Sequence, residues 1–162
     1  MGSEPGIPDA ARDLRAAIEH LEQAVRLSPA NARYSGLLGE AWLLQGDPEA
    51  GLAPLQNSLQ QETHPRIASL MAMALLRLDR PADAARIATV ALEETSAFPR
   101  GHFLRAEARI GLGDVDGAIE DLRHAVSLAP TSEPYRLRLA THLVERARGG
   151  DHGSLIEARE VL

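Results

Sequence analysis

The sequence predicts an all-α fold, a right-handed superhelical solenoid of antiparallel helix pairs. Three observations lead to this expectation. One pattern of small and apolar residues recurs at intervals of 33 or 34 positions. Hydrophobic residues make up 44% of the chain but aromatic residues only 3%, so the core must consist mainly of Ala and Leu, which suits closely packed helices. Short Gly, Asp and Pro signals separate the apolar stretches and mark turns.

The recurring pattern is a small residue, a small or apolar residue four positions later, and another small residue three positions after that, followed by Val or Leu. Its four copies are Ala17, Leu21, Ala24 and Val25; Gly51, Leu55, Ser58 and Leu59; Ala84, Ala88, Ala91 and Leu92; and Ala118, Leu122, Ala125 and Val126. Spacings of four and seven place these side chains on one face of a helix. A period of 34 residues corresponds to one helical hairpin per repeat.

A second helical pattern lies between these copies, and it also carries a small residue at the repeat period. These small residues are Gly39, Ala72, Ala106 and Ala140. We expect them to permit close approach between the two helices of a hairpin. Pro48 and Pro81 follow turn signals and fit the first turn of a helix, where a missing N–H group is no loss.

These signals together define the expected elements and units. The expected helices cover residues 8–28, 32–45, 48–61, 66–78, 81–95, 99–112, 115–128, 133–148 and 154–162. We interpret residues 1–8 as a cloning remnant or a disordered leader and 9–162 as a single solenoid. Its units are 9–31, the second helix of a partial repeat, then 32–64, 65–98, 99–132 and 133–162, the last with a surface loop insertion at 148–153. Because both ends lack polar caps, we expect a fragment of a longer repeat array or of a multidomain protein.

The chain resembles the tetratricopeptide repeat family from about residue 9 to residue 162. The stretch 112–122, which continues to Ala125, Val126 and Pro130, is close to the family consensus, and Leu38, Gly39 and Trp42 followed by Gly46 form another match. The resemblance places Trp42 inside its hairpin. Arg105 and Arg109 depart from it, because the family usually has apolar or aromatic residues there. We therefore expect the first helix of unit 99–132 to be less tightly seated.

The resemblance implies a concave surface, lined by the first helix of each unit, that receives a peptide or a partner protein. Arg33, Arg66 and Arg100 recur 33 and 34 positions apart near the starts of these helices, with Arg136 or Arg138 in a similar place in the last unit. Such a ladder of guanidinium groups would suit an acidic partner. The alternative is that these arginines pair with Glu40 and Glu107. The candidate partner-binding residues are Arg33, Glu40, Arg66, Met73, Arg100, Phe103, Glu107, Leu137 and Arg138.

Catalytic and ligand motifs are missing from the sequence. No nucleophile elbow, phosphate-binding loop, zinc-protease motif or dinucleotide fingerprint is present, and the six His residues form no i, i+4 pair. We expect no enzyme activity, cofactor or metal. Asp114, Asp116, Glu120 and Asp121 are interpreted as an acidic helix start beside its positive dipole end. Family members that clamp chaperone tails use Lys and Asn, and this chain has no Lys, so that function is not expected.

A net charge of −6 argues against nucleic-acid binding, and no apolar run is long enough to span a membrane. We expect an adaptor or scaffold that binds a peptide or protein, from a bacterium because all 17 basic residues are Arg. Two alternatives stay open: self-association through uncapped terminal helices that stack head-to-tail, and the recruiting arm of a larger enzyme. The sequence favours the cytoplasm and leaves the periplasm open, because the absence of Cys does not separate the two.

Overall fold

The computed structural model describes residues 10–162, and within this range every regular element is an α-helix. The helices are α1 (Ala10–Leu27), α2 (Ala32–Gln45), α3 (Pro48–Gln61), α4 (Pro65–Arg77), α5 (Pro81–Glu94), α6 (Pro99–Gly111), α7 (Val115–Leu128), α8 (Glu133–Arg148) and α9 (His152–Val161). All nine predicted helices are confirmed, with ends displaced by at most two residues. No helix of the described range is both long and apolar enough to cross a membrane.

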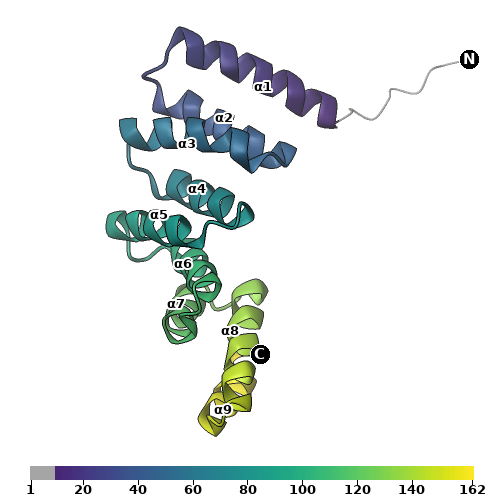
Figure 1. The fold of residues 1–162 in the computed structure, drawn as a ribbon, viewed down its shortest axis with the longest axis vertical. Helices are drawn as coiled ribbons and strands as arrows, with labels where there is room; N and C mark the ends of the chain where they lie inside the picture. The colour runs from purple at the N-terminus through teal and green to yellow at the C-terminus, as the bar shows by residue number, and fades with distance from the viewer. Residues whose placement is uncertain (1–9) are drawn as a thin grey trace, which may run out of the picture. The chain divides into compact units, whose positions relative to one another are not determined.

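The helices belong to two compact units, which divide between Thr63 and His64 (Figure 1). The first contains α1 to α3 and the second α4 to α9. The continuity of a single solenoid from 9 to 162 stays a prediction. The interpretation of residues 1–8 as a leader lies outside the described residues.

Glycine makes the crossing of α2 and α3 in the first unit unusually close. A Cβ atom on Gly39 would overlap the side chain of Leu55 and lie 3.1 Å from the carbonyl oxygen of Gly51. Leu55 is fully buried, so its side chain cannot move aside without disturbing the core. The predicted role of the small residue at position 39 is confirmed, because any side chain there would push the two helices apart.

The other side of α2 packs on α1. Ile18, Leu38 and Ala41 are buried together, and Trp42 is half-buried against them. Trp42 therefore contributes to the α1–α2 contact.

Side-chain hydrogen bonds fix the connection between α1 and α2 onto α3. The Asn57 amide nitrogen donates to the carbonyl oxygen of Pro29 at 3.3 Å and to the Ser35 hydroxyl at 2.8 Å. The Ser58 hydroxyl donates to the carbonyl oxygen of Ala32 at 2.8 Å. These bonds position the first turn of α2, which carries a predicted site residue.

In the second unit, each helix contacts the next along the chain, and α4 also contacts α6. Small side chains supply much of the buried surface of α4 and α5, together with Leu70, Leu75 and Ile87. The fully buried alanines here are Ala68, Ala72, Ala74, Ala84, Ala88 and Ala91. Larger residues build the core of α6 to α9, where Ile119, Leu122, Leu139 and Leu143 lie together with at most 1% exposure. Figure 1 shows α8 and α9 side by side.

The predicted insertion forms a short connection from Gly149 to Asp151, and α9 begins two residues earlier than predicted. Asp151 caps α9, because its carboxylate accepts hydrogen bonds from the Gly153 amide at 3.1 Å and the Ser154 hydroxyl at 2.7 Å. Arg146 donates to Asp151 at 2.8 Å and to Asp116 on α7 at 3.2 Å. The Ser154 hydroxyl and the Arg146 guanidinium lower the pKa of Asp151 to about 2.

Candidate functional site

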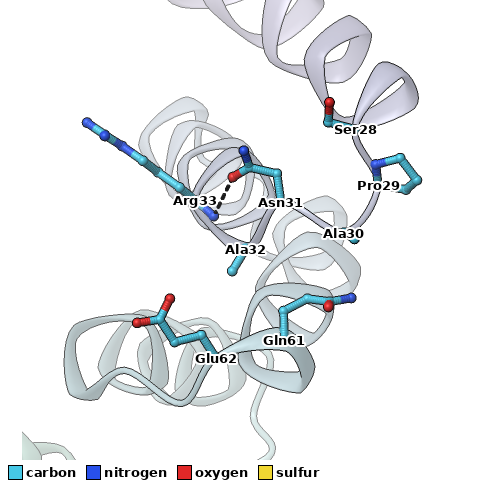
Figure 2. A pocket seen from close by; sticks show the side chains of 8 residues that line it. All are labelled: Ser28, Pro29, Ala30, Asn31, Ala32, Arg33, Gln61 and Glu62. Carbon is cyan, nitrogen blue, oxygen red and sulfur yellow. Dashed lines mark hydrogen bonds between the residues drawn. The ribbon is translucent and has the colours of Figure 1, made fainter.

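Arg33 is the candidate of the first unit that is most open to a partner. It is the second residue of α2, whose N-cap residue Asn31 accepts hydrogen bonds from the backbone amides of Arg33 and Tyr34 at 3.1 and 3.2 Å. The capping interaction engages the backbone of Arg33 and leaves its side chain exposed. Figure 2 shows the guanidinium group extending away from Gln61. Glu40, the other candidate of this unit, is half-buried and already has an interaction partner.

A shallow depression of about 600 Å³ lies beside Arg33 (Figure 2). The start of α2 and the preceding connection form one wall, and the end of α3 forms the other. The lining residues are Ser28, Pro29, Ala30, Asn31, Ala32, Arg33, Gln61 and Glu62. The depression offers side-chain amides, one carboxylate and one guanidinium group, which can form hydrogen bonds with the backbone of an extended peptide.

In the second unit, Arg66 and Arg100 occupy the same position in their helices as Arg33 does in α2. Each is the second residue, in α4 and α6 respectively. Arg66 is exposed and has an interaction partner. Arg100 is exposed, and its Nη2 atom lies 3.5 Å from the sulfur of Met73 on α4. Within the described residues, no carboxylate pairs with the guanidinium group of Arg100.

Phe103, Glu107 and Arg138 join consecutive hairpins. The Phe103 ring on α6 lies 4.9 Å from the Tyr135 ring on α8, at an interplanar angle of 33°. Arg138 on α8 donates to both oxygens of Glu107 on α6, at 2.6 and 2.7 Å. Glu107 therefore pairs with Arg138 and not with Arg100. The ring of Phe103, a candidate partner-binding residue, is half-buried at a helix contact.

Leu137 remains the most open apolar candidate. Its side chain on α8 is 56% exposed. The second unit therefore brings the Met73 and Arg100 side chains together and locks Glu107 to Arg138. Whether the nine candidates bind a partner stays a prediction.

Sequence reasoning missed a buried ionic cluster centred on Asp121, which is only 1% exposed. Arg105 donates to both carboxylate oxygens at 2.9 and 2.7 Å, and Arg109 donates to one at 2.8 Å. The Nδ1 atom of His102 lies 3.1 Å from the same carboxylate. The two arginines that depart from the family pattern do not loosen this contact; they tie α6 to α7.

The interpretation of Asp121 as part of an acidic helix start is wrong. Asp121 is the seventh residue of α7 and therefore lies beyond the first turn of this helix. Asp114 does have the expected role, because it is the N-cap residue and accepts a hydrogen bond from the Gly117 amide at 3.0 Å. Two arginines spaced i, i+4 at positions that are usually apolar were the signal that a buried acid lies opposite.

Burial alone would raise the pKa of Asp121, but the hydrogen bonds from Arg105 and His102 and the charges of Arg105 and Arg109 outweigh it. The pKa of this carboxyl therefore lies below its ordinary value of 3.8. The same contact raises the pKa of Arg105. The Asp121 carboxylate is therefore ionised at neutral pH, and it faces the Arg105 and Arg109 guanidinium groups inside a helix contact. This arrangement joins α6 to α7 and pairs both arginines with the Asp121 carboxylate.

No group of three His, Asp or Glu side chains in the described range is arranged to hold a metal ion. His102 stacks on His124 with ring centroids 5.0 Å apart, and its two ring nitrogens already face the Asp121 carboxylate and the Ser96 carbonyl oxygen.

Comparisons with known proteins agree with this architecture. Two models described as tetratricopeptide repeat match residues 10–74 and 69–133. A comparison with curated proteins gave no match. The chain belongs to the tetratricopeptide repeat family, and its fold is an all-α helical repeat solenoid.

Several solved structures are similar to the chain. MamA from Desulfovibrio magneticus RS-1 aligns with a TM-score of 0.79 and 20% identity, covering 96% of this chain and 95% of that one. YrrB, described as having an unusual peptide-binding site, aligns with a TM-score of 0.76 and 12% identity over 94% and 77%. The first such domain of Spaghetti (RPAP3), bound to the HSP90 peptide SRMEEVD, aligns with a TM-score of 0.69 and 19% identity over 72% and 93%. At these identities the likeness concerns the fold alone.

Proposed function

We propose that the chain is a non-catalytic protein-interaction module whose first helices bind an extended acidic segment of a partner protein. The observation that carries the proposal concerns the exposure and the ion pairing of the Arg33 and Arg100 guanidinium groups. Both guanidinium groups are exposed, and within residues 10–162 neither forms an ion pair. Arg105 and Arg109, farther along α6, are paired with Asp121. Arg123 on α7 is paired with Glu157, and Arg138 on α8 with Glu107.

The position of these arginines in their helices supports an anionic ligand. A guanidinium group on the second residue lies in the first turn, where the helix dipole also favours negative charge. Met73 beside Arg100 adds an adaptable apolar contact, and Leu137 adds an exposed one. Two similar proteins whose descriptions mention peptides, YrrB and RPAP3, support a peptide as the ligand, and the RPAP3 peptide SRMEEVD is acidic.

The experiment uses immobilised peptide arrays with acidic, neutral and basic members, followed by fluorescence anisotropy on the strongest binder. The test variant combines Arg33→Glu, Arg66→Glu and Arg100→Glu. The control combines Arg15→Glu, Arg26→Glu and Arg86→Glu, which makes the same charge change at exposed positions outside the candidate set.

We expect acidic peptides to be enriched and the test variant to bind at least about tenfold more weakly, with affinity falling as salt rises. The control should retain most of its affinity. The proposal is lost if basic or neutral peptides bind best, or if both variants lose affinity equally. Circular dichroism confirms that each variant is folded.

A further inference from the structure

Met73 on α4 and Arg100 on α6 join the first helices of two successive hairpins. The Arg100 Nη2 atom lies 3.5 Å from the Met73 sulfur. Met73 is half-buried, whereas Arg100 is exposed. A thioether carries no charge and is only a weak hydrogen-bond acceptor, so this contact does not neutralise the guanidinium group. Arg100 therefore keeps its capacity to bind a carboxylate.

The next two first helices, α6 and α8, contain an ion pair at the corresponding contact. Glu107 stands 34 residues after Met73, and Arg138 stands one turn beyond the register of Arg100, on the same side of its helix. Arg138 donates to both carboxylate oxygens of Glu107, from Nε at 2.6 Å and from Nη2 at 2.7 Å. A carboxylate at this contact therefore holds the arginine of the following hairpin in a bidentate pair.

The α4–α6 contact contains the cation of such a pair without its anion. Within residues 10–162, no carboxylate pairs with Arg100. Met and Glu side chains extend equally far from the backbone, so a Glu at position 73 would bring its carboxylate to the place of the sulfur and the methyl group. The two contacts therefore differ in charge and not in the reach of the side chain.

We propose, on the basis of the function proposed above, that Met73 is a specificity-determining residue of the partner-binding surface, because it leaves Arg100 unpaired. An acidic side chain of the partner segment binds Arg100 in the place that the Glu107 carboxylate takes at the next contact. The pair of Glu107 with Arg138 gives the geometry, in which both carboxylate oxygens accept from Nε and Nη2 of one guanidinium group. Met73 itself contacts the ligand through its apolar side chain.

The surroundings of Arg100 define the chemistry of the ligand. Because Arg100 is exposed, a continuous chain can pass it and present a side-chain carboxylate, and no chain end is needed. Leu76 lies one turn beyond Met73 on the same side of α4, and it is also half-buried. Met73 and Leu76 offer apolar surface beside the cation. The preferred ligand is therefore an internal acidic residue with an apolar neighbour in an extended segment.

The test measures the affinity of the full chain for the strongest acidic peptide of the array by fluorescence anisotropy. The peptide is amidated at its C-terminus, so that only side chains carry carboxylates. Met73→Glu brings a carboxylate within reach of Arg100 and should weaken binding at least about tenfold, because an internal pair replaces the ligand. Met73→Gln has the same shape without the charge, and Met73→Leu keeps the apolar contact. Both should bind within about threefold of the parent.

A double-mutant cycle separates pairing from repulsion of the peptide. Arg100→Gln should weaken binding at least about tenfold in the parent but less than about threefold in the Met73→Glu background, where the arginine is already paired. The variant Met73→Glu with Glu107→Met keeps the net charge of the parent and should lose the same dependence on Arg100. Ala82→Glu, at an exposed position of α5, adds the same charge as Met73→Glu and should change affinity less than about twofold.

Peptide variants test the ligand side of the same contact. Replacing the acidic residues of the peptide one at a time by their amides should identify one whose loss weakens binding at least about tenfold in the parent and less than about threefold in Arg100→Gln. A Ser in place of the apolar neighbour of that residue should weaken binding about threefold. If no acidic residue of the peptide is coupled to Arg100, or if the apolar neighbour has no effect, the assigned ligand is wrong.

The failure of this inference differs from the failure of the proposed function. If Met73→Glu binds the acidic peptide as tightly as the parent, or if Met73→Gln weakens binding equally, the role of Met73 is overturned while acidic-peptide binding stands. An equal cost of Arg100→Gln in the parent and in Met73→Glu has the same meaning. A parent chain that binds no acidic peptide overturns the proposed function and the role of Met73 together. Circular dichroism confirms that each variant is folded.

Discussion

The α2–α3 and α6–α7 hairpins follow the same repeat but hold together by different physics. In α2 the positions of Ser35, Leu38 and Trp42 correspond to His102, Arg105 and Arg109 in α6, each 67 residues later. In the first set Leu38 and Trp42 pack on α1, and the α2–α3 crossing rests on the apolar contact of Leu55 with Gly39. The second set binds the buried carboxylate of Asp121.

The comparison shows that the repeat constrains where helices cross and not which interaction joins them. Both hairpins keep a small residue at the crossing and a left-handed turn residue after the first helix, Gly46 with φ 90° and Gly113 with φ 81°. Arg105 and Arg109 occupy the apolar register only because Asp121 supplies their counter-charge. Substitutions in the two hairpins should therefore have different costs and different pH dependences.

The largest expected effect comes from Leu55→Ala in the apolar hairpin. Leu55 is fully buried against Gly39, so the truncation leaves a cavity and should lower the free energy of unfolding by about 3–5 kcal/mol. Urea unfolding followed by circular dichroism measures the loss. A cost below about 1 kcal/mol would show that the α2–α3 contact collapses into the space and is less rigid than the structure indicates.

Asp121→Asn should be the next most damaging change. It preserves shape but leaves Arg105 and Arg109 without a counter-charge, at a cost of about 2–4 kcal/mol. In the control, a grafted variant, the four residues of the cluster are replaced by the residues at the corresponding positions of α4 and α5. The substitutions are His102→Ala, Arg105→Met, Arg109→Leu and Asp121→Ile. That variant should recover to within about 1 kcal/mol of the parent, because a packed apolar contact replaces the ions. If the grafted variant is as unstable as Asp121→Asn, the ionic cluster contributes more to stability than an apolar contact at the same positions.

The pH dependence of this difference gives a third test. The folded-state pKa of Asp121 lies below 3.8, so its ionic contribution is complete above that value and is lost as pH falls through the lowered pKa. The stability gap between the parent and Asp121→Asn should be equal at pH 7 and pH 5 and should shrink near pH 3. Urea unfolding at the three pH values measures it. A gap that already narrows between pH 7 and pH 5 contradicts a lowered pKa.

The smallest effects should come from the turns, which both hairpins share. Gly46→Ala and Gly113→Ala introduce a Cβ that meets nothing within 4 Å, so the cost is that of a left-handed backbone, about 1 kcal/mol in each case. Asp79, with φ 55°, occupies the corresponding turn after α4. Asp79→Gly should raise the stability, by less than either glycine substitution lowers it. Thermal unfolding compares the three variants, and clearly unequal glycine costs would separate two turns that the structure makes alike.

Most of the fold could be predicted from the sequence because helix ends depend on local signals. Pro48, Pro81 and Gly46 mark starts and stops through backbone preferences that act within a few residues. The 34-residue period then sets the order of the hairpins. The close approach at Gly39 followed from the same pattern.

The site could be predicted only in part, because pairing partners lie far apart in the chain. Glu107 could pair with Arg100 within its helix or with Arg138 in the next hairpin, and sequence spacing favoured the wrong partner. Asp121 was hidden among neighbouring acids that do lie at a helix start. Only the packing of α6 on α7 shows which of these acids is buried.

The ionic cluster also bears on misfolding. Repeats with similar sequences can pair in the wrong combination as they fold. If α7 packed on α4, the residues opposite Asp121 would be Met71 and Leu75, which occupy the register of Arg105 and Arg109. A buried carboxylate without a cation would destabilise that pairing by several kcal/mol. The refolding yield of the grafted variant, which lacks this safeguard, measures the effect. Asp121 thus favours α6 over α4 as the helix that pairs with α7.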